Sequence, residues 1–268
     1  SGQGYLSAAQ VQSQIDVLNE DFGALPGSPG APGSDSMIRF QLAALDPSGQ
    51  VTSGITYSTD DAWFADGGQY WNALAWDPNR YLNIYTNDAG GTLGYVPAVP
   101  QSGGVGLAAD RVVLFWQVVG KNAPYGPEHD MGRTATHEVG HYLGLFHTFQ
   151  GGCSPSGCNS GGDLICDTSA ESSPTFGCPT SKSGCGGNDP VQNYMDYTDD
   201  PCVWEFTEEQ IRRMRCTLEF WRPSLWTASA GCGLFSTYCT AGTSAAGCRA
   251  RLEANGTPSA SAASGFEV

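Results

Sequence analysis

The clearest periodic pattern along the chain is a helical one close to its N-terminus. Apolar residues recur at Val11, Ile15 and Leu18 with polar residues between them, and Ser7 stands before them as a candidate N-cap. The segment 8–22 is therefore predicted to be an amphipathic helix. A final helix is predicted over 207–221, where Thr207 supplies a cap, two glutamates occupy the first turn, and a proline follows the last turn.

Strand patterns lie between these two helices. The alternation of apolar and polar residues, or a short apolar run bounded by turn residues, predicts strands at 37–45, 54–58, 81–86, 92–97 and 111–119. The last of these is apolar on both faces, as a central strand should be. The segment 68–76 is ambiguous and is a candidate helix. Strands interleaved with helices up to residue 149 indicate an α/β (α+β) sheet layer.

A change in composition divides the chain after residue 149. From 150 to 203 the sequence is dominated by Gly, Ser, Asp and Cys, which predicts irregular structure held by disulfides. We therefore expect an upper subdomain at 1–149, a lower one at 150–223 and an Ala/Ser/Gly-rich tail at 224–268. The tail is either a disulfide-bound stub or the beginning of a further module, and it contains a glycosylation sequon at 255–257.

The cysteines point to an oxidising compartment. All ten lie in the second half of the chain, and their even number suits disulfides. A cysteine metal cluster is the alternative, but no C-x-x-C pair occurs and the spacings are irregular. No apolar run is long enough to span a membrane, and the chain opens without a basic, then apolar, leader. The sequence therefore predicts a secreted protein in a mature, soluble form.

Net charge narrows the range of partners. The formal net charge is -15, with 27 acidic and 12 basic residues. Such a surface repels phosphate backbones and anionic lipids, whereas it attracts cationic peptides or calcium. Nucleic acid and membrane partners are not expected.

Three of the four histidines lie close together, within the segment "HEVGHYLGLFH" that begins at His137. Residues four apart on a helix are about 6 Å apart along the axis and share a face, so His137 and His141 can bind one metal ion. His147 would lie about 240° around a continued helix, facing away. The helix must therefore end before His147, and Gly144 is the residue that can adopt the left-handed conformation at a helix C-terminus.

This arrangement predicts a zinc site with an open coordination position. Three neutral imidazoles leave zinc most of its charge, so the pKa of a bound water falls toward about 7. Glu138, beside the first ligand, is the expected general base. Histidines on buried helices are more often core residues, but Gly144 and His147 at fixed offsets favour the metal site. The fourth histidine, His129, lies outside the spacing and is taken as a loop residue, with a contact to the substrate as the alternative.

A second motif strengthens this interpretation. "NYMDYTDDPC", residues 193–202, provides the methionine-containing turn expected downstream of an extended zinc motif. Met195 is expected to form an apolar floor beneath the metal, and the hydroxyl of Tyr197 is expected to reach the oxyanion. The alternative for Met195 alone is an ordinary core methionine.

Several motifs in order resemble the pappalysin family of metzincin metalloproteases, which includes ulilysin. They are "GRTATHEVGHYLGLFHTFQGGC", "GDLICDTSAE", "PTFGCP", "NYMDYTDDPC" and "FTEEQIRRM", with "QIDVLNEDF" and "YLNIY" before them, so the resemblance covers residues 5 to 222. It implies a metzincin catalytic domain with a twisted five-stranded mixed sheet, a backing helix, a zinc helix and an irregular lower subdomain with the Met-turn.

The resemblance also implies further site residues. Asp163 and Thr168 match calcium ligand positions, and Asp167 does so less surely; oxygen ligands in a glycine-rich loop suit calcium. Asp200 matches an aspartate at the base of the pocket for the side chain after the scissile bond, which favours Arg and less often Lys. A solvated turn is the alternative for Asp200.

Family pairing suggests the disulfides Cys153–Cys185 and Cys178–Cys202. Cys158 and Cys166 bracket an insertion relative to the small family members and are candidates for a local pair. The other four cysteines are left for the C-terminal part, at 216, 232, 239 and 248.

The expected function is therefore that of a secreted zinc endopeptidase that binds peptides with basic residues. A catalytically inactive metal-binding or adhesion module is the alternative, although such proteins tend to lose the general base or a ligand. Another metzincin family, such as the astacins or matrixins, is a third possibility that the "NYMDYTDD" and "FGCP" segments disfavour.

Overall fold

The computed structural model describes residues 3–153, 158, 161–228, 250–254 and 266–267. Its helices are α1 (Ala8–Gly23), α2 (Asp61–Phe64), α3 (Trp71–Leu74), α4 (Arg133–Tyr142) and α5 (Glu208–Phe220). Its strands are β1 (Ile38–Leu42), β2 (Ile84–Asn87), β3 (Gly94–Tyr95), β4 (Val112–Phe115), β5 (Trp226–Ala228), β6 (Ala250–Ala254) and β7 (Phe266–Glu267). Helices and strands mix along the chain, so the α/β class is confirmed.

The strands form two sheets where a single five-stranded sheet was expected. One has the order β2-β4-β3, with β2 parallel and β3 antiparallel to β4. The other has the order β1-β6-β5-β7, with β1 parallel to β6. The expectation was wrong in this detail because the tail, which the family resemblance does not cover, supplies a strand that pairs with β1. The described tail strands thus extend the sheet that β1 begins.

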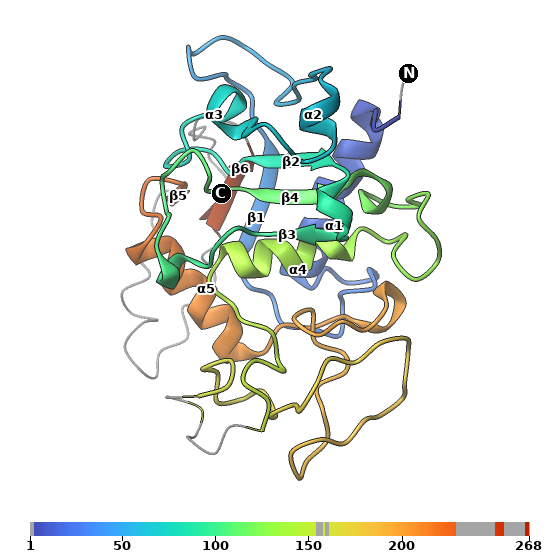
Figure 1. The fold of residues 1–268 in the computed structure, drawn as a ribbon. Coiled ribbons are helices and arrows are strands. Elements are labelled where there is room, and N and C mark those ends of the chain that lie inside the picture. The colour runs from blue at the N-terminus through green and yellow to red at the C-terminus, as the bar shows by residue number, and fades with distance from the viewer. Residues whose placement is uncertain (1–2, 154–157, 159–160, 229–249, 255–265, 268) are drawn as a thin grey trace.

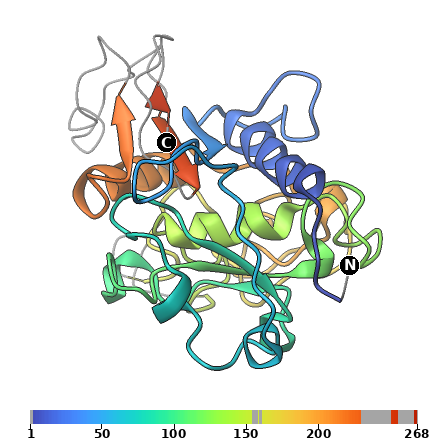
Figure 2. The ribbon, with the colours of Figure 1, turned by 90° about the horizontal axis from the view of Figure 1, so that it is seen from above.

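Helices α1 and α4 lie side by side, with α4 between α1 and the three-stranded sheet (Figure 2). Helix α4 contacts β4 and β3, while α1 contacts both β1 and α4. In Figure 1 the segment that follows α4 loops below it, away from the three-stranded sheet. This arrangement leaves α4 with the sheet on one side and the irregular segment on the other.

Helix α1 confirms the pattern that predicted it. The Ser7 side chain accepts a hydrogen bond from the backbone N–H of Gln10 at 3.2 Å. Leu18 and Phe22 are fully buried, and the Phe22 ring contacts Phe40 and Phe206 with ring centroids 4.9 and 5.0 Å apart. Each such buried side chain contributes about 1.5–3 kcal/mol. The burial of this face anchors α1 against the core.

Helix α5 likewise begins where expected. Thr207 and Gln210 form a capping box, in which each side chain accepts a hydrogen bond from the other residue's backbone N–H. Ile211, Met214 and Leu218 are buried. The helix therefore packs one apolar stripe into the core.

The strand expected at 54–58 is absent, and this prediction was wrong. Gly54 takes φ +72°, and its backbone lies so close to Ala43 that an added Cβ would sit 2.6 Å from the Ala43 nitrogen. Tyr57 stacks on Tyr5, and its hydroxyl donates to the carbonyl of Leu6. The segment whose apolar alternation suggested a strand is thus a surface loop held by side-chain contacts. The ambiguous segment 68–76 contains the short helix α3, and the pattern gave no sign of α2.

From 150 to 206 the described residues contain one short 3₁₀ helix, Asp200–Cys202, and isolated bridges. Three disulfides join residues within this part of the chain: Cys153–Cys185, Cys158–Cys166 and Cys178–Cys202. The two pairs implied by the family and the local pair are confirmed, and no described cysteine is free. Cys216 is disulfide-bonded as well.

Some expectations about the tail cannot be compared with the structure. Cys232, Cys239, Cys248 and the sequon at 255–257 lie outside the described residues. The division into subdomains at residue 149 stays a prediction. In the part of the chain that is described, no helix has the length and apolar character needed to cross a membrane.

A buried carboxylate joins α1 to α4. Asp21 is 3% exposed, accepts a hydrogen bond from the Thr136 hydroxyl at 2.7 Å and lies 3.5 Å from the Arg133 guanidinium. Burial raises the pKa of Asp21 to about 6, although Arg133 and Thr136 oppose the shift. Because the folded-state pKa exceeds the ordinary value, the stability that protonation confers is full below about pH 4 and is lost as the pH rises through 6.

We therefore expect Asp21→Asn to flatten the pH dependence of stability between about pH 4 and 6. The difference in unfolding free energy between variant and wild type should change by about 3 kcal/mol across this window. Urea unfolding at a series of pH values measures it. Asp16→Asn, at an exposed site on the same helix, is the control and should track the wild type. An unchanged pH profile for Asp21→Asn would contradict the assignment.

Tight packing below α4 gives a second prediction. A Cβ added at Gly140 would lie 2.5 Å from the sulfur of Met195, which is fully buried. Gly140→Ala should therefore destabilise the protein by about 1–3 kcal/mol. Met195→Ala should remove that penalty when the two changes are combined, as a double-mutant cycle of urea unfolding would measure. Gly187→Ala, where an added Cβ meets no atom within 4 Å, controls for the change in the unfolded chain. Additive effects at 140 and 195 would refute the contact.

Candidate active site

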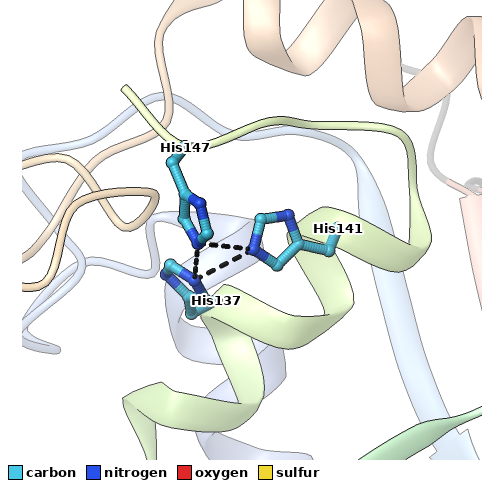
Figure 3. Close-up of side chains that lie close together, drawn as sticks. All are labelled: His137, His141 and His147. Carbon is cyan, nitrogen blue, oxygen red and sulfur yellow. Dashed lines mark hydrogen bonds between the residues drawn. The ribbon is translucent and has the colours of Figure 1, made fainter. Parts of the chain in front are cut away.

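Three imidazoles meet at one point beside α4 (Figure 3). His137 and His141 project from the helix, and His147 comes from the segment after it. The Nε2 atoms of His137 and His141 are 3.1 Å apart, and the Nε2 of His147 lies 3.2 and 3.0 Å from them. The structure thus brings together the three histidines that the spacing selects.

A chain reversal after α4 makes this convergence possible. The helix ends at Tyr142, and Gly144 follows with φ +93°. The backbone N–H groups of Gly144 and Leu145 donate to the carbonyls of His141 and Gly140 at 2.9 and 3.0 Å. A Cβ at Gly144 would meet the Thr217 hydroxyl at 2.6 Å. Both the conformation and the close approach therefore require glycine, and the expected end of the helix is confirmed.

Hydrogen bonds fix which ring nitrogen carries the proton. The Nδ1 atoms of His137 and His141 lie 2.7 and 2.8 Å from the carbonyl oxygens of Tyr194 and Leu145. A carbonyl oxygen only accepts, so each Nδ1 must carry the hydrogen and each Nε2 presents a lone pair. Such backbone partners commonly orient metal-binding histidines.

Burial keeps these rings neutral. Burial is the main cause of all three shifts. It lowers the pKa of His137 well below its usual value, lowers the pKa of His141, and lowers the pKa of His147 to about 3. The Nε2 acceptors of His137 and His141 therefore face each other and cannot hydrogen-bond to one another. This donor set fits a borderline metal ion such as zinc, which takes imidazole nitrogen in tetrahedral sites.

The turn at 193–197 supports the histidines from below. The side-chain oxygen of Asn193 accepts the backbone N–H of Met195 at 3.0 Å, and Met195 is fully buried against α4. The backbone N–H of Thr148 donates to the Met195 carbonyl at 3.2 Å. The turn is thus bonded to the segment that carries His147, while the adjacent Tyr194 carbonyl holds His137.

Glu138 lies beside His137 in a buried position, 6% exposed. Desolvation raises the pKa of Glu138 to about 8. Strand β3 passes so close that a Cβ on Gly94 would lie 2.9 Å from the Cγ of Glu138 and 3.0 Å from the Val113 carbonyl. A glycine at this position of β3 is therefore needed for the Glu138 side chain to fit.

Tyr197 stands at the rim of the site and is 39% exposed. Its ring centroid lies 5.6 Å from that of His137 and 4.9 Å from those of His147 and Phe149. Phe176, which is 70% exposed, is the next ring outward at 5.9 Å. Partial burial raises the pKa of Tyr197, and the nearby carboxylates of Glu138 and Asp196 add to this, so the hydroxyl keeps its proton.

A cavity of about 360 Å³ opens beside His137 and Glu138. Asp200 lies in its wall and is 3% exposed. The Oδ2 atom of Asp200 accepts the backbone N–H groups of Met131 and Arg133 at 2.9 and 3.2 Å, and the Arg133 guanidinium donates to the Asp200 backbone carbonyl. The remaining lining residues are Thr92, Leu93, Gly94, His129, Arg133, Thr134, Phe176, Tyr194, Asp196, Tyr197, Thr198, Asp199 and Val203.

His129 was taken as a loop residue, yet it lines this cavity. Its Nδ1 lies 3.8 Å from the Oδ1 of Asp200. The backbone N–H of Asp200 donates to the Glu128 carbonyl at 2.8 Å, which brings the two segments together. Spacing within the sequence carries no signal for this pairing because 71 positions separate the residues along the chain. Phe176 was missed for the same reason.

The residues expected to bind calcium are only partly brought together. The Thr168 hydroxyl donates to Asp163 Oδ2 at 2.6 Å and lies 3.3 Å from the Ile165 carbonyl. Asp167 faces α5 instead, where its two carboxylate oxygens accept the Thr207 hydroxyl and the Glu209 backbone N–H. Asp163 and Thr168 therefore form one oxygen cluster, from which the Asp167 carboxylate is turned away.

Comparisons with known proteins agree with this geometry. Residues 67–219 match the family model described as pregnancy-associated plasma protein-A. Extracellular metalloprotease 1 of Coccidioides posadasii is 37% identical over 220 residues, which is 79% of this chain and 69% of that protein. An extracellular metalloprotease of Pyricularia oryzae is also 37% identical, over 79% of this chain and 67% of its own.

Solved structures give the same result. Mirolysin in complex with compound 9 aligns with a TM-score of 0.68 at 34% identity, covering 80% of this chain and 85% of that one. Tannerella forsythia mature mirolysin in complex with a cleaved peptide aligns with a TM-score of 0.65, at the same identity and coverage. The chain belongs to the pappalysin family of metzincins and is an extracellular zinc metalloendopeptidase.

Proposed function

We propose that this peptidase holds its zinc ion with His137, His141 and His147, uses Glu138 as its general base, and cleaves on the N-terminal side of Arg and, less often, Lys. The observation that carries the proposal is the convergence of three Nε2 atoms within 3.0–3.2 Å beside a buried glutamate and an open cavity. Few other functions need this combination of groups.

Glu138 moves the proton during peptide hydrolysis. A bound zinc ion supplies a Lewis acid that polarises the substrate carbonyl and makes water more acidic. The Glu138 carboxylate accepts the proton of the attacking water and then passes it to the nitrogen of the leaving amine. Its buried position favours this role, because desolvation raises the basicity of a carboxylate.

Tyr197 stabilises the oxygen of the scissile carbonyl as that oxygen gains negative charge. Its ring packs against His147 and Phe149 at the rim of the cavity, which holds the phenol near the point of attack. Because its raised pKa keeps the hydroxyl protonated, Tyr197 can donate a hydrogen bond.

Asp200 recognises the side chain that follows the scissile bond. Two backbone N–H groups bind its Oδ2, which stabilises the ionised carboxylate in a buried position. A guanidinium that enters the cavity beside Glu138 meets this charge, and arginine pairs with carboxylates better than lysine does. Mirolysin, a structural relative, is known in complex with a cleaved peptide, so peptides are the expected substrate class.

Cleavage of a mixed peptide library tests these roles. Mass spectrometry of the products should show Arg, and less often Lys, directly after the cleaved bond. Glu138→Ala removes the general base, and a zinc chelator removes the metal. Each should therefore lower the rate at least about 100-fold. Asp200→Asn should retain cleavage while losing the preference for basic residues.

The outcomes separate the parts of the proposal. Chelator-sensitive cleavage with no basic preference would refute the pocket and leave the catalytic roles standing. Unchanged activity in Glu138→Ala would refute the general base. Circular dichroism of each variant controls for loss of folding.

We also propose that Asp163 and Thr168 bind calcium. The Thr168 hydroxyl lies 2.6 Å from Asp163 Oδ2 and 3.3 Å from the Ile165 carbonyl oxygen in one loop, and such a set of oxygens suits calcium. The loop is next to α5, because the Arg213 guanidinium donates to the carbonyls of Asp163 and Leu164. A cation here would stabilise the lower part of the molecule.

Thermal unfolding with calcium or with a calcium chelator tests this site. Calcium should raise the melting temperature of the wild type by several degrees, since a ligand that binds only the folded state stabilises it. Asp163→Asn should abolish the response. Asp167→Asn, which weakens the cap of α5, should lower the melting temperature and keep the calcium response. A wild type that is indifferent to calcium would rule the site out.

A further inference from the structure

The imidazole of His129 and the carboxylate of Asp200 lie next to each other in the wall of the cavity. Their side chains are 21% and 4% exposed, and Nδ1 of His129 lies 3.8 Å from Oδ1 of Asp200. This separation is too long for a hydrogen bond but short enough for strong electrostatic attraction. Both residues line the same cavity as His137 and Glu138.

The two oxygens of Asp200 have different surroundings. Oδ2 accepts the backbone N–H groups of Met131 and Arg133, so it is held by the start of α4. Oδ1 is the oxygen that lies next to the imidazole of His129. A basic substrate side chain that approaches Asp200 must therefore share this carboxylate with His129.

The other charges around His129 favour its protonated form. Asp200, the first residue of the 3₁₀ helix, and Asp199, directly before it, lie close to His129, and Glu128 is its neighbour in its own segment. The Tyr125 ring lies 5.5 Å away, and the buried Arg133 is directed to the backbone carbonyl of Asp200. The Asp200 carboxylate is the largest cause that raises the pKa of His129, and Asp199 and Glu128 add to it, against partial burial.

We propose that His129 is a specificity-determining residue, which competes with the basic side chain of the substrate for the Asp200 carboxylate. This inference rests on the proposed recognition of basic residues by Asp200. When His129 is protonated, the pair is neutral, and an entering guanidinium meets a second positive charge. When His129 is neutral, the carboxylate is available to the substrate. The preference for basic residues therefore increases with pH.

The coupling works in both directions. If protonation of His129 weakens binding of an arginine side chain by some factor, then binding of that side chain lowers the proton affinity of His129 by the same factor, and so lowers its pKa. A neutral side chain of the same shape has no such effect. Citrulline has this property, because it replaces the guanidinium of arginine by an uncharged urea.

Two peptides that differ only in Arg or citrulline after the scissile bond form the test. The ratio of their kcat/KM values removes every pH effect that the substrates share, including those of Glu138 and the metal site. In the wild type this ratio should rise on the order of tenfold from about pH 6 to about pH 8.5, as a single nearby charge is removed. In His129→Gln the ratio should stay at the high-pH level throughout.

Glu128→Gln is the matched control in the same loop. It removes an exposed charge close to His129, so the transition should remain while its midpoint moves to lower pH. A wild-type ratio that is high at every pH and falls in Asp200→Asn would overturn the role of His129 and leave recognition by Asp200 intact. A ratio near one at every pH, in both wild type and Asp200→Asn, would overturn the two together.

Nuclear magnetic resonance gives a measurement independent of turnover. His129 is the one histidine of the four that is not a proposed metal ligand, so in zinc-loaded Glu138→Ala its imidazole should be the one that still titrates. The Arg peptide should lower its pKa, and the citrulline peptide should leave it unchanged. Equal effects of the two peptides would refute the competition, even if His129→Gln failed to fold.

Discussion

Three imidazole nitrogens directed at one point are the constraint on which the rest of the structure depends. The Nε2 atoms of His137, His141 and His147 lie 3.0–3.2 Å apart, and those of His137 and His141 both present a lone pair, so the surrounding protein must hold the rings in place. The carbonyls of Tyr194 and Leu145 orient two of the rings. The reversal at Gly144 brings in the third. The Tyr194 carbonyl comes from a segment 57 positions beyond His137, which explains why the site needs a folded domain.

The local features of this site could be predicted from the sequence, because helical spacing and helix ends obey short-range rules. The positions of His137 and His141, the stop at Gly144 and the cap at Thr207 are of this kind. The long-range features could not. The pairing of β1 with a tail strand and the approach of His129 to Asp200 join residues that no periodicity relates. The expected strand at 54–58 failed because Gly54 adopts a left-handed conformation that a pattern of apolar residues cannot reveal.

Arg133 connects the start of α4 with both α1 and the wall of the cavity, a link that the sequence alone does not reveal. It is buried at the first turn of α4, where its guanidinium lies near Asp21 of α1 and donates to the backbone carbonyl of Asp200. The helix that carries two of the histidines is therefore bonded at its start to the wall of the substrate cavity. A shift of α4 would move the histidines and the wall of the cavity together, which keeps the two in register.

The Cys178–Cys202 disulfide has a consequence for where this chain can be made. Cys202 follows Asp200 by two residues, and Cys178 follows Phe176 by two, so one covalent bond ties together two parts of the cavity wall. The histidines and Glu138 contain no sulfur and are positioned by hydrogen bonds and packing. In a reducing cytosol the histidines and Glu138 would therefore lose less of their support than this wall would. Protein made there would keep the three histidines together beside a cavity of altered shape.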